Sequence, residues 1–151
     1  MNLNELIILL ADDDTDDRIF FKDAIAELIN PVNFTAVRDG EELMQLLSNE
    51  TKILPHVIFL DLNMPRKNGF ECLAEIKKNK RLKNLPVVIF STSFEQEVVD
   101  LLYDNGAHFF IRKPSEFKLF KKIILYTLTR FIPQNIIQPA KINFVLTVEN
   151  S

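Results

Sequence analysis

Five short apolar runs, each followed by a stretch with helical spacing, constrain the fold of this chain more than any other feature. The runs cover residues 6–11, 34–37, 57–60, 86–90 and 109–111. Each is too short for a helix and stops at polar or turn-forming residues, which is typical of a buried strand. Five alternations of strand and helix predict an α/β fold, in which a parallel sheet is covered by helices on both faces.

The predicted helices begin and end at recognisable signals. The first follows Asp14 or Thr15, either of which is placed to cap it, and ends before Pro31. Three more cover residues 41–48, 70–77 and 95–103, and the last follows Ser115 and extends to Phe131. Asp14, Asp16 and Asp17 are accordingly interpreted as helix-start residues, because acidic side chains are favourable in a first turn.

Composition and charge exclude several classes of protein. The 151 residues suit one domain, and a net charge of −3 provides no basic field for nucleic acid. The single cysteine, Cys72, cannot form an internal disulfide and is interpreted as a core residue. The first apolar run is too short for a signal peptide or a membrane span. We therefore expect a soluble, cytoplasmic protein with neither nucleic acid nor membrane as a partner.

Chemically active side chains follow four of the five strands. Asp12 and Asp13 follow the first strand, Asp61 the third, Ser91 the fourth and Lys113 the fifth. The carboxyl ends of parallel strands share one edge of a sheet, where ligands bind. Crowded carboxylates raise one another's pKa, and a hard cation such as Mg²⁺ relieves this repulsion. A hydroxyl and an ammonium beside them would bind an anion, so the set suits phosphoryl transfer to a carboxylate.

The order and spacing of these residues resemble the receiver domain of response regulators in two-component phosphorelays. The resemblance extends from Leu6 to Ile132 and is carried by Asp12-Asp13, Asp61-x-Asn63-Met64-Pro65 with Gly69 following, Ser91-Thr92 and Lys113-Pro114. It implies a doubly wound, flavodoxin-like sheet of five parallel strands in the order 2-1-3-4-5, flanked by five helices.

The resemblance also implies a role for each residue of the acidic group. Asp61 would be the phosphoacceptor, taking a phosphoryl group from a histidine kinase or a histidine phosphotransfer protein. Asp13 and Asp61 would bind Mg²⁺ through their side chains and Asn63 through its backbone carbonyl, with Asp12 acting largely through water. The protein would then be a signalling phosphoacceptor, catalysing only its own phosphorylation and dephosphorylation, and not an enzyme with another substrate.

The remaining site residues would bind the phosphoryl group and transmit its presence. Ser91 and Lys113 would each contact a phosphoryl oxygen, with Lys113 aimed inward by a cis peptide bond before Pro114. Phe110 occupies the family's aromatic switch position. We expect Ser91 to move toward the phosphoryl group and Phe110 to turn inward, which would change the surface of the fourth helix, fifth strand and fifth helix for a downstream partner.

Two other functions compete with this interpretation. A pseudo-receiver would be only a protein-binding scaffold, but it should lack part of the acidic pair, the acceptor or the lysine, and all are present. An aspartate-dependent phosphatase of the haloacid dehalogenase type needs a second Asp two residues after the first, where this chain has Asn63.

The chain divides into a receiver domain, residues 1–132, and a C-terminal extension, residues 133–151. Nothing after Ile132 is long enough for an output domain, so a stand-alone receiver is expected. Residues 133–139 are interpreted as a linker. Beyond them Ile142, Phe144, Leu146 and Val148 alternate with other residues, which predicts one more strand. It would extend its own sheet or, as we favour, pair with a second copy to form a homodimer.

Three further features have structural interpretations. His56 and His108 each precede a strand without any partner motif and are interpreted as structural. The basic residues between Lys77 and Lys83 are interpreted as a solvated helix end and loop, with an acidic partner as the alternative.

Overall fold

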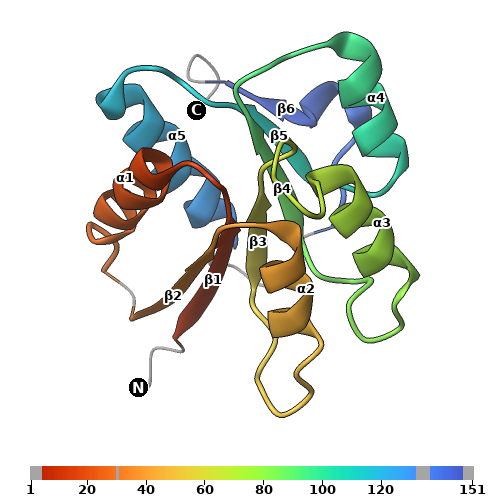
Figure 1. Ribbon diagram of the computed structural model, residues 1–151. Helices are drawn as coiled ribbons and strands as arrows, with labels where there is room; N and C mark the ends of the chain where they lie inside the picture. The colour runs from red at the N-terminus through yellow and green to blue at the C-terminus, as the bar shows by residue number, and fades with distance from the viewer. Residues whose placement is uncertain (1–4, 30, 132–136, 148–151) are drawn as a thin grey trace.

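A computed structural model describes residues 5–29, 31–131 and 137–147. In this part of the chain six parallel strands form one sheet in the order β2-β1-β3-β4-β5-β6, and five α-helices cover it (Figure 1). The strands are β1 (Leu6–Ala11), β2 (Val32–Val37), β3 (Val57–Leu60), β4 (Val87–Ser91), β5 (Phe109–Arg112) and β6 (Val145–Leu146). The helices are α1 (Thr15–Ile25), α2 (Gly40–Leu47), α3 (Gly69–Lys78), α4 (Gln96–Asp104) and α5 (Phe117–Phe131). The α/β class and the order 2-1-3-4-5 are confirmed, and β6 is the extra strand.

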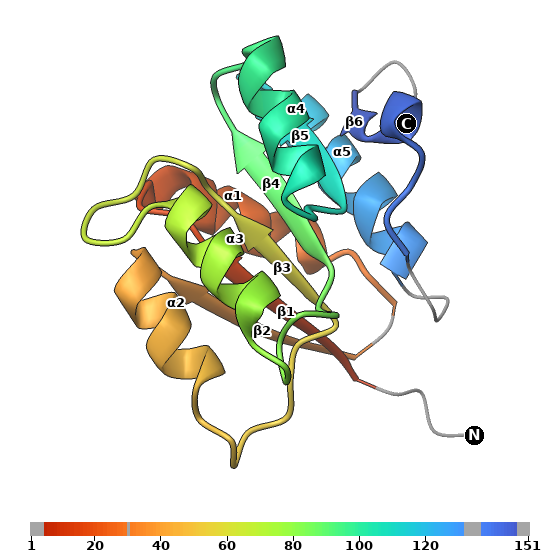
Figure 2. The ribbon, with the colours of Figure 1, turned by 90° about the vertical axis from the view of Figure 1, so that its right-hand side faces the viewer.

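Helices cover both faces of the sheet, so its central strands are buried on both sides. α1 and α5 pack on one face, and α2, α3 and α4 lie on the other (Figures 1 and 2). All four residues of β3 and all five of β4 are buried. This explains why these strands are almost continuously apolar in sequence instead of alternating.

The two faces of the sheet have chemically different cores. The α1/α5 face is aromatic: the Phe21 and Phe59 ring centroids are 4.8 Å apart, and those of Phe90 and Phe120 are 5.2 Å apart. Such edge-to-face pairs fix ring orientation as well as burying area. The opposite face is mainly aliphatic and includes Cys72, which is fully buried as the sequence predicts.

The loops at the carboxyl edge are fixed by helix caps. Asp14 accepts a hydrogen bond from the Asp17 backbone N–H at the start of α1, and Asn68 forms a capping box with Glu71 at the start of α3. Gly69, the first residue of α3, lies against the end of β3, where a Cβ atom would be 2.4 Å from the Asp61 carbonyl oxygen. Only glycine permits this approach.

Two predicted elements differ most from the structure, while the bounds of most others shift by one or two residues. α1 ends at Ile25, earlier than the predicted end before Pro31, and Ile29 beyond it is 94 % exposed. The predicted alternation in the C-terminal extension fails at Ile142, which is 90 % exposed. A 3₁₀ turn, η1 (Lys141–Asn143), precedes β6 and breaks the period of two, while Phe144 and Leu146 are buried as predicted.

β6 pairs with β5 of its own chain, Val145 with Phe110 and Leu146 with Ile111. This is the first of the two arrangements that the sequence left open; a single chain does not test the homodimer. Residues 133–136 of the predicted linker and Val148 lie outside the described residues. Within the described ranges, no helix has the length and apolarity needed to cross a bilayer.

Candidate functional site

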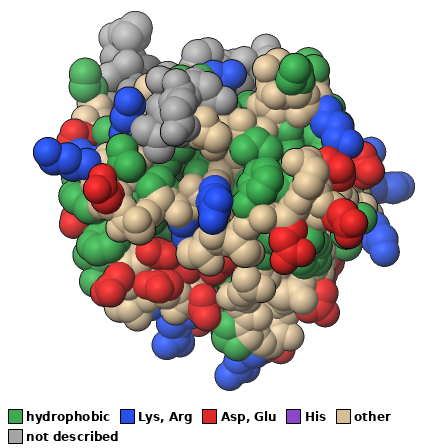
Figure 3. All heavy atoms as spheres, turned by 90° about the horizontal axis from the view of Figure 1, so that it is seen from above, with side chains coloured by type: hydrophobic (Ala, Val, Ile, Leu, Met, Phe, Trp, Pro, Cys, Tyr) green, Lys and Arg blue, Asp and Glu red, His purple; other side chains and the backbone are tan. Residues whose placement is uncertain are grey.

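The side chains that follow the strands in sequence meet at the carboxyl edge of the sheet, as predicted. β1 leads into Asp12 and Asp13, β3 into Asp61 and β5 into Lys113, while Ser91 is the last residue of β4. Figure 3 looks down on this end of the molecule, where acidic side chains gather beside hydrophobic ones. Asp12, Asp61 and Ser91 are buried, although acidic side chains are seldom buried without partners.

Asp12, Asp13 and Asp61 form a group that suits a divalent cation. Each offers one carboxylate oxygen, and the three oxygens lie within 4.8 Å of one another. Asp12 and Asp61 are buried while Asp13 is exposed, so a cation would be held from the floor of the site and reached from solvent. Hard oxygen donors of this number are what Mg²⁺ or another divalent ion requires, with water completing its coordination.

Lys113 lies among these carboxylates. Its Nζ is 2.7 Å from Asp12 Oδ2, 2.8 Å from Asp17 Oδ2 and 3.6 Å from Asp61 Oδ2, and its side chain is only 5 % exposed. The Phe90 ring lies below the ammonium, 5.2 Å from it to the centroid. This geometry makes Lys113 the cation of the site.

The prediction of a cis peptide bond before Pro114 is wrong, since the described residues include no cis bond. Lys113 points inward for a different reason. Its backbone N–H donates to the Ser91 carbonyl at 2.7 Å, and its ammonium is held by the carboxylates of Asp12 and Asp17.

Burial dominates the electrostatics of the acidic group, and the charge of Lys113 is the main effect that opposes it. Burial raises the pKa of Asp61 to about 7; the carboxylates of Asp12 and Asp13 add to this, and Lys113 opposes it. Burial also raises the pKa of Asp12, again against the effect of Lys113. Burial alone would lower the pKa of Lys113, but the carboxylates of Asp12 and Asp61 outweigh it and raise that pKa. One ammonium does not neutralise the group, so the site fits a further cation.

Asp17 and Arg18 contribute to the site although sequence reasoning gave neither a role there. Asp17 is an ion-pair partner of Lys113, and Arg18 Nη1 donates to the Asp12 carbonyl oxygen at 2.8 Å. A signal for Asp17 was available: α1 begins at Thr15, so its first turn, which includes Asp17, follows the end of β1 directly. Its interpretation as a helix-start residue was incomplete.

Ser91 is the last residue of β4, and Phe110 lies in the neighbouring strand β5. Ser91 Oγ is 3.3 Å from Ser93 Oγ and accepts a hydrogen bond from the Ser93 backbone N–H at 3.3 Å. The Phe110 ring is 1 % exposed and contacts the Phe94 ring edge-to-face, at 5.7 Å between centroids. Phe110 thus lies inward in this structure; the predicted movements of Ser91 and Phe110 stay predictions.

Asn63 lies two residues after Asp61, in the β3–α3 loop, and is exposed. Its backbone N–H donates to Asp61 Oδ1 at 3.4 Å, which orients one oxygen of that carboxylate. Its predicted role as a metal ligand through the backbone carbonyl stays a prediction.

Both histidines make the structural contacts that were expected. His56 Nδ1 accepts a hydrogen bond from the Ile7 backbone N–H, and His108 Nδ1 accepts one from Val87. Each ring therefore links the start of one strand to its neighbour, away from the acidic group.

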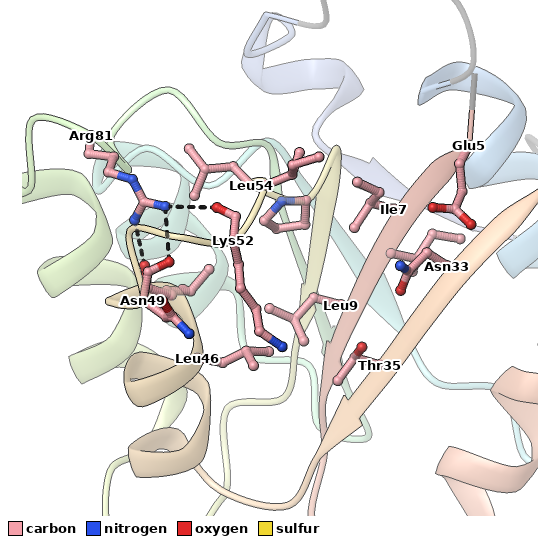
Figure 4. A pocket seen from close by; sticks show the side chains of 14 residues that line it. Glu5, Ile7, Leu9, Asn33, Thr35, Leu46, Asn49, Lys52, Leu54 and Arg81 are labelled. Carbon is pink, nitrogen blue, oxygen red and sulfur yellow. Dashed lines mark hydrogen bonds between the residues drawn. The ribbon is translucent and has the colours of Figure 1, made fainter.

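A separate hollow of about 250 Å³ lies at the opposite edge of the sheet, between α2 and the first two strands (Figure 4). Arg81 borders it and donates to the carbonyl oxygens of Leu47, Asn49 and Lys52, which fixes the α2–β3 loop. Part of the basic segment is therefore structural. None of the predicted site residues lines this hollow.

The fold and the site together define a receiver-type signalling domain. The family model of the response regulator receiver domain matches residues 8–125, and the chain belongs to this family. It is 34 % identical over 122 residues to response regulator Rcp1 of Synechocystis sp., covering 78 % of this chain and 83 % of that protein. Response regulators of this family act in two-component systems.

Solved structures agree with this assignment. The phosphorylated cyanobacterial phytochrome response regulator RcpA has a TM-score of 0.83 and 30 % identity, covering 90 % of this chain and 100 % of that chain. The Mn²⁺-bound form of Rcp1 has a TM-score of 0.80 and 30 % identity, covering 89 % and 99 %. A structural relative thus binds a divalent metal ion.

Proposed function

We propose that this protein accepts a phosphoryl group on Asp61 in a Mg²⁺-dependent reaction and signals through altered binding of a partner or by passing the group onward. Receiver domains of this family interact with histidine kinases or phosphotransfer proteins, and we assign one of these as the donor. The observation that carries the proposal is the position of Asp61. Its carboxylate lies 3.6 Å from Lys113 and shares a group of oxygens within 4.8 Å with Asp12 and Asp13.

The donor set determines how a metal ion would be held. The side chains of Asp13 and Asp61 and the backbone carbonyl of Asn63 would bind Mg²⁺ directly, and Asp12 largely through water. When bound, the ion neutralises negative charge on the acceptor and on the phosphoryl oxygens.

The residues of the chain supply the remaining chemistry. Asp61 Oδ2 attacks the phosphorus of a phosphohistidine, a P–O bond forms, and the P–N bond breaks with its electron pair returning to the imidazole. Lys113 is already within reach of Asp61 and pairs with a phosphoryl oxygen, while Ser91 Oγ donates to another. Loss of the group by attack of water on phosphorus returns the carboxylate, so the protein turns over only its own phosphorylation.

A donor-docking surface lies beside the acidic group. Phe20 of α1 and Phe117 of α5 have ring centroids 5.2 Å apart, and Phe117 is 39 % exposed. Both border the same hollow as Asp17 and Lys113. Apolar side chains at the rim of a charged site are suited to a protein donor. Phe117→Ser should therefore slow transfer from a phosphorylated histidine phosphotransfer protein and leave transfer from acetyl phosphate unchanged.

Intact-mass measurement tests the proposal directly. The protein is incubated with acetyl phosphate and Mg²⁺ beside Asp61→Asn and a matched variant, Asp16→Asn, which removes an exposed carboxylate nearby. We expect one phosphate adduct in the wild type and in Asp16→Asn, none in Asp61→Asn, and none in any protein when EDTA replaces Mg²⁺. The absence of an adduct in the wild type, together with no Mg²⁺-dependent beryllofluoride binding, would favour the scaffold function.

The output surface is proposed to be that of α4, β5 and α5, whose arrangement would respond to Ser91 and Phe110. A homodimer through residues 133–151 also stays a prediction. Sedimentation equilibrium of the full chain, with and without beryllofluoride, checks it: a single monomeric mass in both conditions would contradict it.

A further inference from the structure

Residues 138–146, here called the clasp, cover part of the surface that a downstream partner was expected to use. The clasp crosses the C-terminal end of α4 and then adds β6 to the edge of β5 (Figure 1). Its contacts are specific in chemistry and in register, and they come from three kinds of interaction.

Hydrogen bonds fix the start of the clasp on the end of α4. Gln138 Nε2 donates to the carbonyl oxygens of Tyr103 and Ala107, at 2.7 Å and 2.8 Å. In return, the Tyr103 hydroxyl donates to the Pro139 carbonyl oxygen at 2.7 Å. A primary amide has the two donors that this pair of carbonyls requires. The Gln138 side chain therefore binds both carbonyl oxygens at the end of α4.

Apolar side chains fix the other end. Phe144 is 1 % exposed, and its ring meets the Tyr103 ring edge-to-face at 5.1 Å between centroids. Leu146 is 4 % exposed and packs in the aromatic core on the opposite face of the sheet. The two side chains therefore close both faces of the sheet at its β5 edge.

Backbone pairing and one ion pair complete the contact. The Phe110 backbone N–H donates to the Phe144 carbonyl oxygen at 3.0 Å, in continuation of the β5–β6 ladder. Lys141 Nζ lies 3.3 Å from Asp100 Oδ1 on α4, at an exposed position where the pair contributes orientation more than stability. Addition of a strand to an edge, combined with side-chain pockets, is a general mode of peptide recognition.

We propose that the end of α4 and the edge of β5 form a peptide-docking groove and that the clasp is its intramolecular ligand. A partner that binds this groove competes with the clasp, because it presents an extended segment with side chains like those of the clasp. That segment has a Gln-like amide, an aromatic side chain six residues later and an apolar residue two positions further. The clasp thereby lowers the apparent affinity of the groove for a partner, whether or not Asp61 accepts a phosphoryl group.

The test uses the full chain and a synthetic peptide with the sequence of residues 137–147. In Phe144→Ala the clasp loses its buried anchor. We expect amide hydrogen exchange at Phe110 to become at least about tenfold faster than in the wild type, while exchange at Phe59 in β3 is unchanged. Ile142→Ala is the matched control, because Ile142 belongs to the clasp but is 90 % exposed, and it should leave exchange at Phe110 unchanged.

Addition of the peptide then distinguishes a groove from a merely structural contact. The peptide should bind Phe144→Ala saturably and restore protection at Phe110, and it should bind the wild type at least about tenfold more weakly because the clasp competes. A peptide with Ala in place of its Phe should do neither. Equal binding to both proteins, or no binding to Phe144→Ala, would overturn the proposal.

A second variant guards against failure of Phe144→Ala to fold. Gln138→Glu places a carboxylate against the two carbonyl oxygens, so it removes both hydrogen bonds without changing the core. It should show the same faster exchange at Phe110 and the same peptide rescue. Unchanged exchange in Gln138→Glu would show that the amide does not hold the clasp, contrary to the proposal.

Discussion

Lys113 Nζ is closer to Asp12 than to Asp61: 2.7 Å separates it from Asp12 Oδ2, against 3.6 Å from Asp61 Oδ2. The lysine therefore balances the buried carboxylate at the end of β1 while staying within reach of the proposed acceptor. Because a buried charge without a partner is costly, the lysine supports the folded state as well as the proposed chemistry.

Replacement of this lysine should destabilise the protein in a way that metal ions reverse. Lys113→Met keeps the aliphatic stem but leaves the carboxylates of Asp12, Asp17 and Asp61 without their ammonium. We expect the free energy of unfolding to fall by about 1–3 kcal/mol. Urea denaturation with EDTA and with Mg²⁺ measures it, and Mg²⁺ should restore part of the loss because it neutralises the same group.

Lys118→Met provides the control for this prediction, since Lys118 is exposed on α5. It should change stability by less than about 0.5 kcal/mol, as expected for an ordinary surface substitution. Equal effects of the two variants, or no response of Lys113→Met to Mg²⁺, would show that the ion pairs do not carry the stability assigned to them.

Asp17 should affect phosphorylation through Lys113. Asp17→Asn removes the carboxylate 2.8 Å from the ammonium, and Asp16→Asn removes an exposed one in the same helical turn. Both variants change the helix-dipole interaction alike. We expect the rate of adduct formation with acetyl phosphate to fall about tenfold in Asp17→Asn only, the typical effect of losing a residue that orients another. Equal rates in both variants would leave Asp17 as a helix-start residue alone.

The sheet was predictable from the sequence because burial on both faces leaves a continuous apolar run. The runs at 57–60 and 86–90 could be placed to within one residue for that reason. The clasp was not predictable to the same degree. Its strand has two residues, and it is held by Gln138 and Phe144 through contacts with Tyr103, far away in the sequence. A local pattern of hydrophobicity does not encode such contacts.

The same distinction applies to the site. Asp12, Asp61, Ser91 and Lys113 were predictable because parallel strands bring their carboxyl ends to one edge. Asp17 was missed because it reaches that edge by way of a helical turn. The inward orientation of the Lys113 side chain was attributed to a cis peptide bond before Pro114. In the structure, ion pairs with the carboxylates of Asp12 and Asp17 hold it inward.

Gly69→Ala should separate helix propensity from packing. Alanine is the better helix former by up to about 1 kcal/mol, so propensity alone predicts a more stable protein. However, its Cβ would lie 2.4 Å from the Asp61 carbonyl oxygen and 2.8 Å from Leu62 Cα. We therefore expect a loss of about 1–3 kcal/mol in thermal or urea unfolding, together with slower phosphorylation of Asp61. A gain in stability would contradict the close approach.

The single thiol should report on unfolding. Cys72 is fully buried, and burial raises its pKa to about 11. Both effects suppress the thiolate in the folded protein. We expect modification by a disulfide reagent at pH 8 to proceed only at the rate of opening of the structure, accelerating with urea in step with loss of circular dichroism. Rapid modification in the absence of denaturant would show that the face of α3 that carries Cys72 is exposed in the folded protein.

His108 should make stability depend on pH in the mildly acidic range. Burial, with a smaller effect of the Lys77 charge, lowers its pKa from 6.5 to about 4. Between these values the unfolded chain binds a proton that the folded chain excludes, so the free energy of unfolding decreases as pH falls from 6.5 toward 4. The loss should reach at most about 3 kcal/mol, and none arises from this group above pH 6.5.

Urea denaturation of the wild type and His108→Asn across this range measures the loss, since the difference in unfolding free energy between the two proteins should change with pH. His56→Asn removes the other histidine that accepts a backbone hydrogen bond, and curves for His108→Asn and His56→Asn that run parallel would exclude His108 as the source.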